Sequence, residues 1–113
     1  MPVTIYHNPQ CSNSRRCLEI IRDAGIEPHI VEYLKAPPGA GELKSLLAQM
    51  DARVRDIIRI KEPVYIELGL DAANDATLID AISTHPILLN RPVVVTEKGA
   101  RLCRPPELVR DLL

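Results

Sequence analysis

The fold is decided by the stretch Arg91-Pro92-Val93-Val94-Val95-Thr96, which is followed by Glu97-Lys98-Gly99 and then by Ala100-Arg101-Leu102-Cys103. β-Branched residues over 93–96 predict a strand, and the three residues after it, which end in glycine, predict a tight turn. Residues 100–103 then form the returning strand of an antiparallel hairpin. Beyond it, Pro105-Pro106-Glu107 predicts the start of a last helix, because proline suits the first turn and glutamate favours a helix N-terminus.

The first third of the chain predicts two further strands joined by a helix. Val3 to Tyr6 is a short β-rich run that ends at the turn Asn8-Pro9, and His29 to Leu34 predicts a second strand. Between them, apolar residues recur at helical spacing from Ser12 to Gly25, where the glycine is expected to end the helix. Two strands joined through a helix are expected to pair in parallel.

A helical block is expected after the chain break at Pro37-Pro38-Gly39. Helices are predicted from Glu42 to Met50, from a capping Asp51 through Arg59, briefly after Glu62-Pro63 up to Gly69, and from a capping Asp75 to His85-Pro86. The resulting order is β-α-β, helical block, β-hairpin and helix. It fits an α/β, thioredoxin-like fold, in which a four-stranded mixed sheet carries flanking helices and the helical block is an insertion between the βαβ and ββα halves.

The composition limits the kind of protein that this sequence can encode. Its 113 residues predict a single domain over 1–113, since compact domains most often hold about 100–150 residues. Fourteen basic and fifteen acidic residues give a net charge of −1, and Phe and Trp are absent, so no nucleic-acid binding is expected. No membrane helix or export signal is apparent, and three cysteines then indicate free thiols in a reducing cytoplasm.

Cysteine chemistry is expected in the loop His7-Asn8-Pro9-Gln10-Cys11-Ser12-Asn13-Ser14-Arg15, between the first strand and the first helix. A cysteine at a helix N-terminus meets unpaired N–H groups and the positive end of the macrodipole, and both favour the thiolate. The same N–H groups can hold a tetrahedral oxyanion. Arg15, Arg16 and His7 are expected to add positive potential. The alternative is a buried structural cysteine, against which the polar and basic neighbours argue.

Ser14 stands where a C-x-x-C motif would place its second cysteine, so Cys11 has no local disulfide partner. Its reaction must then end in a bond to another molecule or use a distant cysteine. Cys17 falls in the apolar pattern of the first helix and Cys103 in the hairpin, and we interpret both as residues without a catalytic role. Dispersed histidines, with no C-x-x-C or H-x-x-x-H pair, make a metal site unexpected.

Three further arginines suit an oxyanion site. Arg91 precedes Pro92, whose loop faces the cysteine loop in a thioredoxin-like sheet and whose peptide bond is expected to be cis. Arg104 ends the hairpin, and Arg59 is expected to close a helix of the helical block. A guanidinium binds such anions through two parallel hydrogen bonds, which an ammonium cannot form. A solvated charge is the alternative for each of them, and it is the interpretation for Arg22, Arg53, Arg55 and Arg110.

The loop Tyr6-His7-Asn8-Pro9-x-Cys11-Ser12-x-Ser14-Arg15 resembles the active-site loop of the glutathione- and glutaredoxin-coupled arsenate reductases. The similarity continues through Glu27-Pro28, Tyr33-Leu34, Arg59, His85-Pro86-Ile87-Leu88-x-Asn90-Arg91-Pro92-Val93-Val94-Val95 and Arg101-Leu102-Cys103-Arg104-Pro105-Pro106-Glu107, which covers essentially the whole chain in order. The resemblance implies that Cys11 is the nucleophile and that His7 and Ser14 support its thiolate. It also assigns Arg59, Arg91 and Arg104 to oxyanion binding, and we add Arg15 from the loop to this substrate-binding set.

The resemblance implies a reaction as well. The Cys11 thiolate attacks arsenate, glutathione attacks the covalent adduct, and glutaredoxin takes up the glutathione as arsenite leaves. Glutathione is then a co-substrate, and no tightly bound cofactor is implied. Two alternatives remain. One is a thiol-sensing regulator of the same superfamily that binds RNA polymerase, against which the missing C-x-x-C argues. The other is an arsenate-reductase-like protein with another thiol role.

Overall fold

The computed structural model describes residues 2–113, which form two compact units. The sheet unit comprises residues 2–36 and 91–113, and the helical unit comprises Pro37–Asn90. The helical unit therefore interrupts the chain between the two halves of the sheet unit, as the sequence predicts. Among the described residues, no helix has the length and apolar character needed to cross a membrane.

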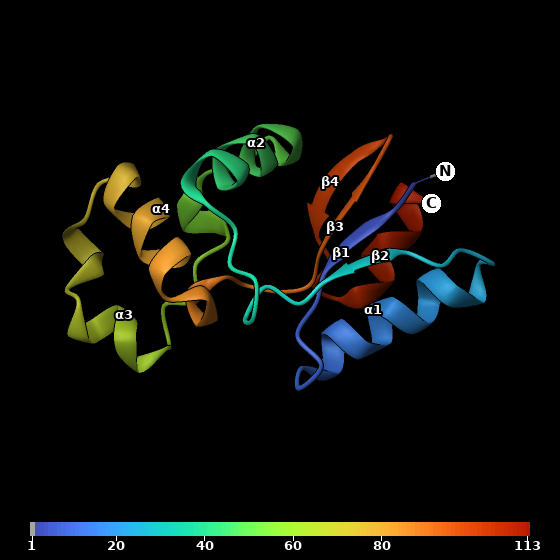
Figure 1. Cartoon of the computed structure of the whole chain (residues 1–113), viewed down its shortest axis with the longest axis horizontal. Helices are drawn as coiled ribbons and strands as arrows, with labels where there is room; N and C mark the ends of the chain where they lie inside the picture. Colours follow the sequence, from blue (N-terminus) through green and yellow to red (C-terminus); the bar gives the residue numbers. More distant parts are fainter. Residues whose placement is uncertain (1) are drawn as a thin grey trace. The chain divides into compact units, whose positions relative to one another are not determined.

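The sheet unit contains a mixed four-stranded sheet in the order β2-β1-β3-β4 (Figure 1). Its strands are β1 (Thr4–Tyr6), β2 (His29–Val31), β3 (Val93–Thr96) and β4 (Gly99–Leu102). β1 pairs in parallel with β2 and antiparallel with β3, so Ile5 lies between Ile30 and Val94. β3 and β4 form the antiparallel hairpin. The predicted mixed sheet and both predicted pairings are confirmed.

Local hydrogen bonds set where β2 and the first helix end. β2 is shorter than predicted because the Glu32 carbonyl accepts the N–H groups three and four residues further on, at 2.9 and 3.0 Å, and turns the chain. Helix α1 (Ser12–Asp23) ends just before Gly25, which has a φ of 81°. The N–H groups of residues 25 and 26 donate back to the last turn at 2.9 and 3.3 Å. This glycine C-terminus confirms the predicted stop.

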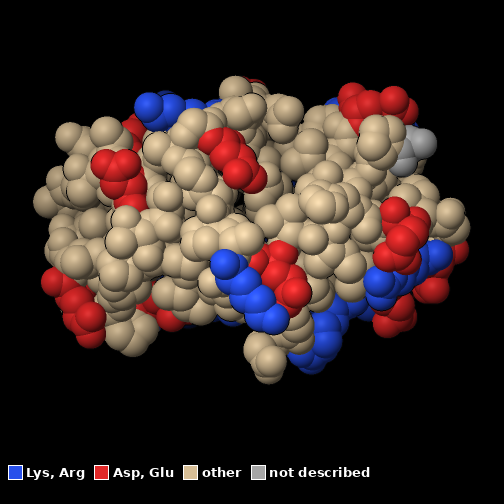
Figure 2. Space-filling model, in the orientation of Figure 1, with Lys and Arg blue, Asp and Glu red and all other residues tan. Residues whose placement is uncertain are grey.

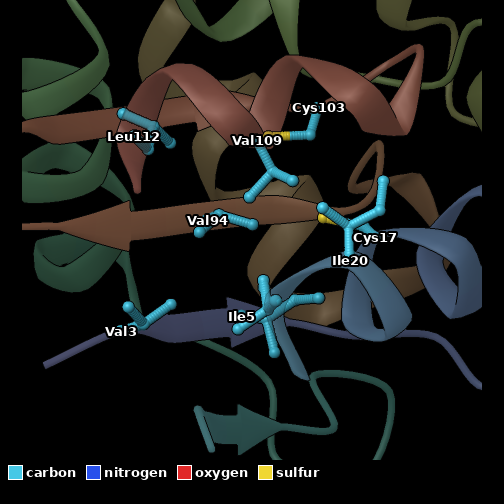
Figure 3. Close-up of a cluster of buried hydrophobic side chains, with 9 residues drawn as sticks. Val3, Ile5, Cys17, Ile20, Val94, Cys103, Val109 and Leu112 are labelled. Carbon is cyan, nitrogen blue, oxygen red and sulfur yellow. The ribbon is translucent and has the colours of Figure 1, made fainter. Parts of the chain in front are cut away.

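One face of the sheet is covered by α1 and by the 3-10 helix η4 (Pro106–Leu112). The core of the unit lies between this face and the two helices (Figure 3). The buried cluster consists of Val3, Ile5, Cys17, Ile20, Ile21, Val94, Cys103, Val109 and Leu112. Cys17, from α1, and Cys103, after β4, are both 0% exposed. Both side chains therefore belong to the packing of the unit, in agreement with the apolar position that the pattern gives Cys17.

The helical unit is built from short elements. These are α2 (Ala40–Met50), η1 (Val54–Asp56), α3 (Pro63–Glu67), η2 (Leu70–Ala72), α4 (Asp75–Thr84) and η3 (Pro86–Leu88). α4 ends at His85-Pro86 as predicted, but its cap is Asn74 rather than Asp75. The Asn74 side-chain oxygen accepts the Thr77 N–H at 2.9 Å, whereas Asp75 is the first residue inside the helix.

The predicted helix from Asp51 through Arg59 is wrong, because only the single turn η1 forms there. Asp51 has a φ of 51° and ends α2, instead of capping a following helix. Ile58 then pairs with Leu89 in an isolated antiparallel bridge, so the backbone before Arg59 is extended. The apolar residues of this segment are nevertheless buried, as the pattern indicates.

Arg55 is not simply a solvated charge, contrary to the interpretation from the sequence. Its Nη1 donates to the Tyr65 hydroxyl at 3.0 Å. Its Nη2 lies 3.0 Å from each of the carbonyl oxygens of Leu70, Asp71 and Ala73. The guanidinium thereby joins η1 to α3 and to the chain around η2, and it fixes a segment of the helical unit that has little regular hydrogen bonding of its own.

Candidate active site

The Cys11 loop closes on itself through Asn8 before α1 begins. Asn8 is 2% exposed, its side-chain oxygen accepts the Gln10 N–H at 2.9 Å, and its carbonyl accepts the Cys11 N–H at 3.0 Å. Cys11 is the N-cap residue of α1, and its carbonyl accepts the Arg15 N–H at 3.0 Å. From the sequence, Asn8 is only part of a turn. In the structure it holds the loop that presents Cys11.

The Cys11 sulfur lies half-buried at the N-terminus of α1. Burial alone would raise the pKa of the Cys11 thiol, but the Ser14 N–H, the Arg91 guanidinium and the Asn13 N–H outweigh it, and the pKa is lowered. The sulfur makes no capping hydrogen bond of regular geometry, so these N–H groups act on it mainly as dipoles that favour negative charge. This is the thiolate-favouring environment that the loop predicts.

Arg91 and Arg104 converge on the Cys11 sulfur from the C-terminal part of the sheet unit. Arg104 Nη1 lies 3.8 Å from Cys11 Sγ and donates to the Arg91 carbonyl at 2.8 Å. The Arg91 guanidinium hydrogen-bonds to the same sulfur. The Arg91–Pro92 peptide bond is cis, as predicted, and the Arg104–Pro105 bond is also cis, which the sequence does not predict. Each guanidinium carries five N–H donors, so this pair can bind the oxygens of a tetrahedral anion beside the sulfur.

His7 and Ser14 form a buried pair under the loop. His7 Nδ1 and Ser14 Oγ are 2.6 Å apart, and Ser14 Oγ also accepts the Asn8 N–H at 3.0 Å. Burial lowers the pKa of His7 from 6.5, against the opposing effect of Glu32. The lowered pKa disfavours the positive charge that the sequence suggests for His7. The contact between His7 Nδ1 and Ser14 Oγ joins the end of β1 to the first turn of α1.

Arg15 and Arg59, the other arginines assigned to the site, make contacts of their own. Arg15 Nη1 donates to the Pro9 carbonyl at 2.9 Å, which keeps this exposed side chain at the loop. Arg59 belongs to the helical unit, where Nε donates to Glu62 at 3.0 Å and Nη1 donates to the Asn90 side-chain oxygen at 3.2 Å. A role of either arginine in substrate binding stays a prediction.

Cys17 and Cys103 are both buried, so neither offers a second exposed thiol. The hydrogen bond with Cys103 and burial both raise the pKa of Cys17, so its thiol stays neutral. The same hydrogen bond lowers the pKa of Cys103, against the opposing effect of burial, and the Cys103 sulfur lies 3.6 Å from the Arg101 carbonyl. All three cysteines are free. Cys11 is the cysteine of this chain that is both partly exposed and placed among positive donors.

Solvent reaches the loop from both flanks. A hollow of about 490 Å³ is lined by His7, Pro9, Arg15, Leu18, Glu19, Arg22 and Asp23, and one of about 370 Å³ is lined by His7, Asn8, Pro9, Gln10, Glu32, Leu34 and Lys35. Figure 2 shows basic and acidic side chains in small groups on a face that consists mostly of other residues. Arg22, which lines the larger hollow, forms an exposed ion pair with Glu27 at 3.0 Å. Both hollows lie beside the loop, and Cys11 does not line either of them.

The fold and the site define a thioredoxin-like chain with one activated cysteine and an arginine pair beside it. The family model of the ArsC family matches residues 6–112, and the chain belongs to this family. It is 53% identical over 115 residues to the arsenate reductase of Rhizobium meliloti (strain 1021), which covers 100% of this chain and 82% of that protein. It is 51% identical over 113 residues to an arsenate reductase of Escherichia coli, which covers 98% and 80%. The solved arsenate reductase from Vibrio cholerae has a TM-score of 0.95 and 43% identity, and covers 100% of this chain and 98% of that one. These similarities confirm the thioredoxin-like fold.

Proposed function

We propose that this protein reduces arsenate to arsenite through a covalent intermediate on Cys11. The observation that carries the proposal is the convergence of Arg91 and Arg104 on a cysteine whose pKa is lowered at a helix N-terminus. The sulfur is a nucleophile and the guanidinium groups are donors for oxyanion oxygens, so one place both binds and attacks a tetrahedral anion. Membership of the ArsC family and the names of its relatives favour arsenate over phosphate.

In the first step, the Cys11 thiolate attacks the arsenic atom of arsenate. A sulfur–arsenic bond forms, and an arsenic–oxygen bond breaks as that oxygen takes up protons and leaves as water. Arsenic remains in its +5 state. Arg91 and Arg104 hold the oxygens that stay on arsenic and offset their negative charge during the attack.

Reduction then needs two thiols from outside the chain. Glutathione attacks the adduct, forms its own sulfur–arsenic bond and displaces a second oxygen as water. A glutaredoxin thiolate attacks the glutathione sulfur, and the electron pair of the broken sulfur–arsenic bond passes to arsenic, which becomes +3. Glutaredoxin and glutathione leave joined as a disulfide, and water releases arsenite from Cys11. External donors fit this chain because Ser14 takes the place of a local second cysteine and Cys17 and Cys103 are buried. A reducing cytoplasm would supply both donors and keep the three cysteines free.

Among residues 2–113, no contact favours the regulator alternative. A thiol switch of the C-x-x-C type would need a sulfur at position 14, where the Ser14 hydroxyl instead holds His7 and the Asn8 N–H. A protein of this fold that uses Cys11 for another thiol reaction is separated from the proposal by the assay that follows.

The decisive measurement is arsenite formation from arsenate in the presence of glutathione and glutaredoxin, with each thiol omitted in turn. We expect activity only with both donors. Cys11→Ser should abolish it, whereas Cys17→Ala and Cys103→Ala should retain most of it, apart from a loss of stability from the core. Arsenite formation by the Cys11 variant, or without either donor, would overturn the proposed reaction.

The arginine pair is tested by lysine substitutions, which keep the charge and remove the two-pronged donor. Loss of one preorganised donor typically lowers turnover about 10²–10³-fold, so Arg91→Lys and Arg104→Lys should impair arsenate reduction to that extent. Alkylation of Cys11 should change much less. Arg110→Lys, on the exposed surface of η4, is the matched control. Equal turnover by all three variants would contradict the anion site.

A further inference from the structure

The side-chain amide of Asn13 lies against the guanidinium of Arg104. An amide nitrogen at this place would set donor against donor, so the oxygen faces Arg104 and accepts from Nη1 and Nη2, each at 3.3 Å. Asn13 is half-buried in the first turn of α1, whereas Arg104 is exposed and follows β4. The contact therefore joins the N-terminal loop that carries Cys11 to the C-terminal segment that carries Arg104, although these two parts of the site are far apart in the sequence.

Asn13 also acts on the nucleophile through its backbone. Its N–H is one of the groups that lower the pKa of Cys11. The main-chain N–H of Asn13 thus favours the Cys11 thiolate, and its side-chain oxygen accepts from the Arg104 guanidinium. Arg104 Nη1 itself lies 3.8 Å from the Cys11 sulfur. We propose that Asn13 is a positioning residue that orients Arg104 for oxyanion binding at Cys11. This inference rests on the anion site of the proposed function.

The hydrogen-bond geometry of Arg104 explains why an acceptor is needed there. The Arg91 carbonyl accepts from Nη1 at 2.8 Å, and the Cys11 sulfur lies 3.8 Å from the same nitrogen, so both contacts are made at one nitrogen of the guanidinium. The Asn13 oxygen, placed between Nη1 and Nη2, adds a contact at the second nitrogen and so fixes the plane. Nε and the outer hydrogen of Nη2 are then left in a fixed direction for the oxygens of a bound anion. A long exposed side chain without this contact would sample many rotamers and bind the anion less well.

An amide suits this position better than a carboxylate. Asp at position 13 would hold Arg104 more strongly, but it would place a negative charge beside the Cys11 thiolate and an incoming oxyanion. A neutral oxygen orients the guanidinium without cancelling its charge. The proposal therefore predicts different outcomes for removing the acceptor and for charging it.

The test measures how well inorganic phosphate protects Cys11 from alkylation by iodoacetamide, and at which pH the alkylation rate reaches half its maximum. In Asn13→Ala, the half-protecting phosphate concentration should rise about threefold to tenfold, as expected for losing one ordinary hydrogen bond that positions Arg104 without touching the anion. The alkylation midpoint should stay near that of the unchanged protein, because the backbone N–H remains. Asn13→Asp should raise both the midpoint and the half-protecting concentration. Ser12→Ala, an exposed neighbour in the same turn, is the control and should change neither.

A double-substitution cycle separates positioning from a merely structural role. If Asn13 acts through Arg104, Asn13→Ala should have no further effect on protection in a chain that already carries Arg104→Ala. Full additivity of the two substitutions, or phosphate protection of Asn13→Ala equal to that of the unchanged protein, would overturn the inference and leave the proposed reaction untouched. If phosphate and arsenate both fail to protect the unchanged protein, the anion site itself is wrong and both proposals fall. Phosphate protection that depends on Asn13, in a protein that forms no arsenite, would support the inference and refute only the proposed reaction.

Discussion

Replacing Ser14 with alanine would remove one hydroxyl that hydrogen-bonds to two buried polar groups. Ser14 is 0% exposed, and its oxygen accepts the Asn8 N–H at 3.0 Å while it lies 2.6 Å from His7 Nδ1. Asn8 is 2% exposed and His7 is 6% exposed, so neither polar group can readily turn to water instead. The backbone N–H of Ser14, which helps to lower the pKa of Cys11, is retained in the variant.

The expected effect of Ser14→Ala is therefore on stability first. Each buried group left without a partner costs about 1–3 kcal/mol, so two such groups predict a loss of about 2–6 kcal/mol in the free energy of unfolding. For a chain of this size that corresponds to a fall in Tm of about 8–25 °C. It is a substantial part of the about 5–15 kcal/mol that holds a typical domain folded.

Urea unfolding of Ser14→Ala, with Ser12→Ala as the exposed control, measures this loss directly. The pH profile of Cys11 alkylation, recorded on the same samples below their transition, should keep its midpoint. A destabilisation smaller than about 0.5 kcal/mol would refute the reasoning, since surface substitutions already reach that size. A raised alkylation midpoint at unchanged stability would also refute it, because the hydroxyl would then act on the thiolate itself.

Three other predictions follow from contacts in the two units. Cys11 should be alkylated at a lower pH than free cysteine, and a midpoint at or above that of a cysteine peptide would contradict the lowered pKa. Because the pKa of His7 is lowered from 6.5 in the folded protein, the unfolded chain binds the proton more readily. Stability should therefore fall as the pH drops below about 6.5, and this part of the pH dependence of urea unfolding should disappear in His7→Asn. Arg55→Ala should lower the free energy of unfolding by about 1–3 kcal/mol, through loss of its contacts across the helical unit, whereas the exposed side chain of Arg53 should be replaceable by alanine with little change. Equal stability of the two arginine variants would contradict the role of Arg55.

Features that depend on neighbouring residues were predictable from the sequence. The hairpin follows from a β-branched run and a glycine turn, and Gly25 ends α1 for a reason confined to that turn. The placement of Cys11 at a helix N-terminus follows in the same way from the turn before it and the helical spacing after it. Each of these inferences needs only a few consecutive residues.

Features that depend on distant residues were not predictable in this way. The segment before Arg59 has helical spacing, but the bridge between Ile58 and Leu89 extends it, and no local pattern reports such a pairing. The burial that lowers the pKa of His7 is not visible in the sequence either, because it depends on residues packed around the side chain from other elements. The contact of Asn13 with Arg104 joins residues from opposite ends of the chain, and only the folded sheet unit brings them together.

The division of the sheet unit between the two ends of the chain affects how the protein is made. During synthesis, β1, α1 and β2 leave the ribosome first, and the whole helical unit follows before β3 can join the free side of β1. Until then the apolar face of α1 has no η4 to cover it. Arg91 and Arg104 arrive with the same later segment. A growing chain therefore carries Cys11 without the two arginines that lie at its sulfur until residues 91–104 have been made, so the donors that favour the thiolate are incomplete until then.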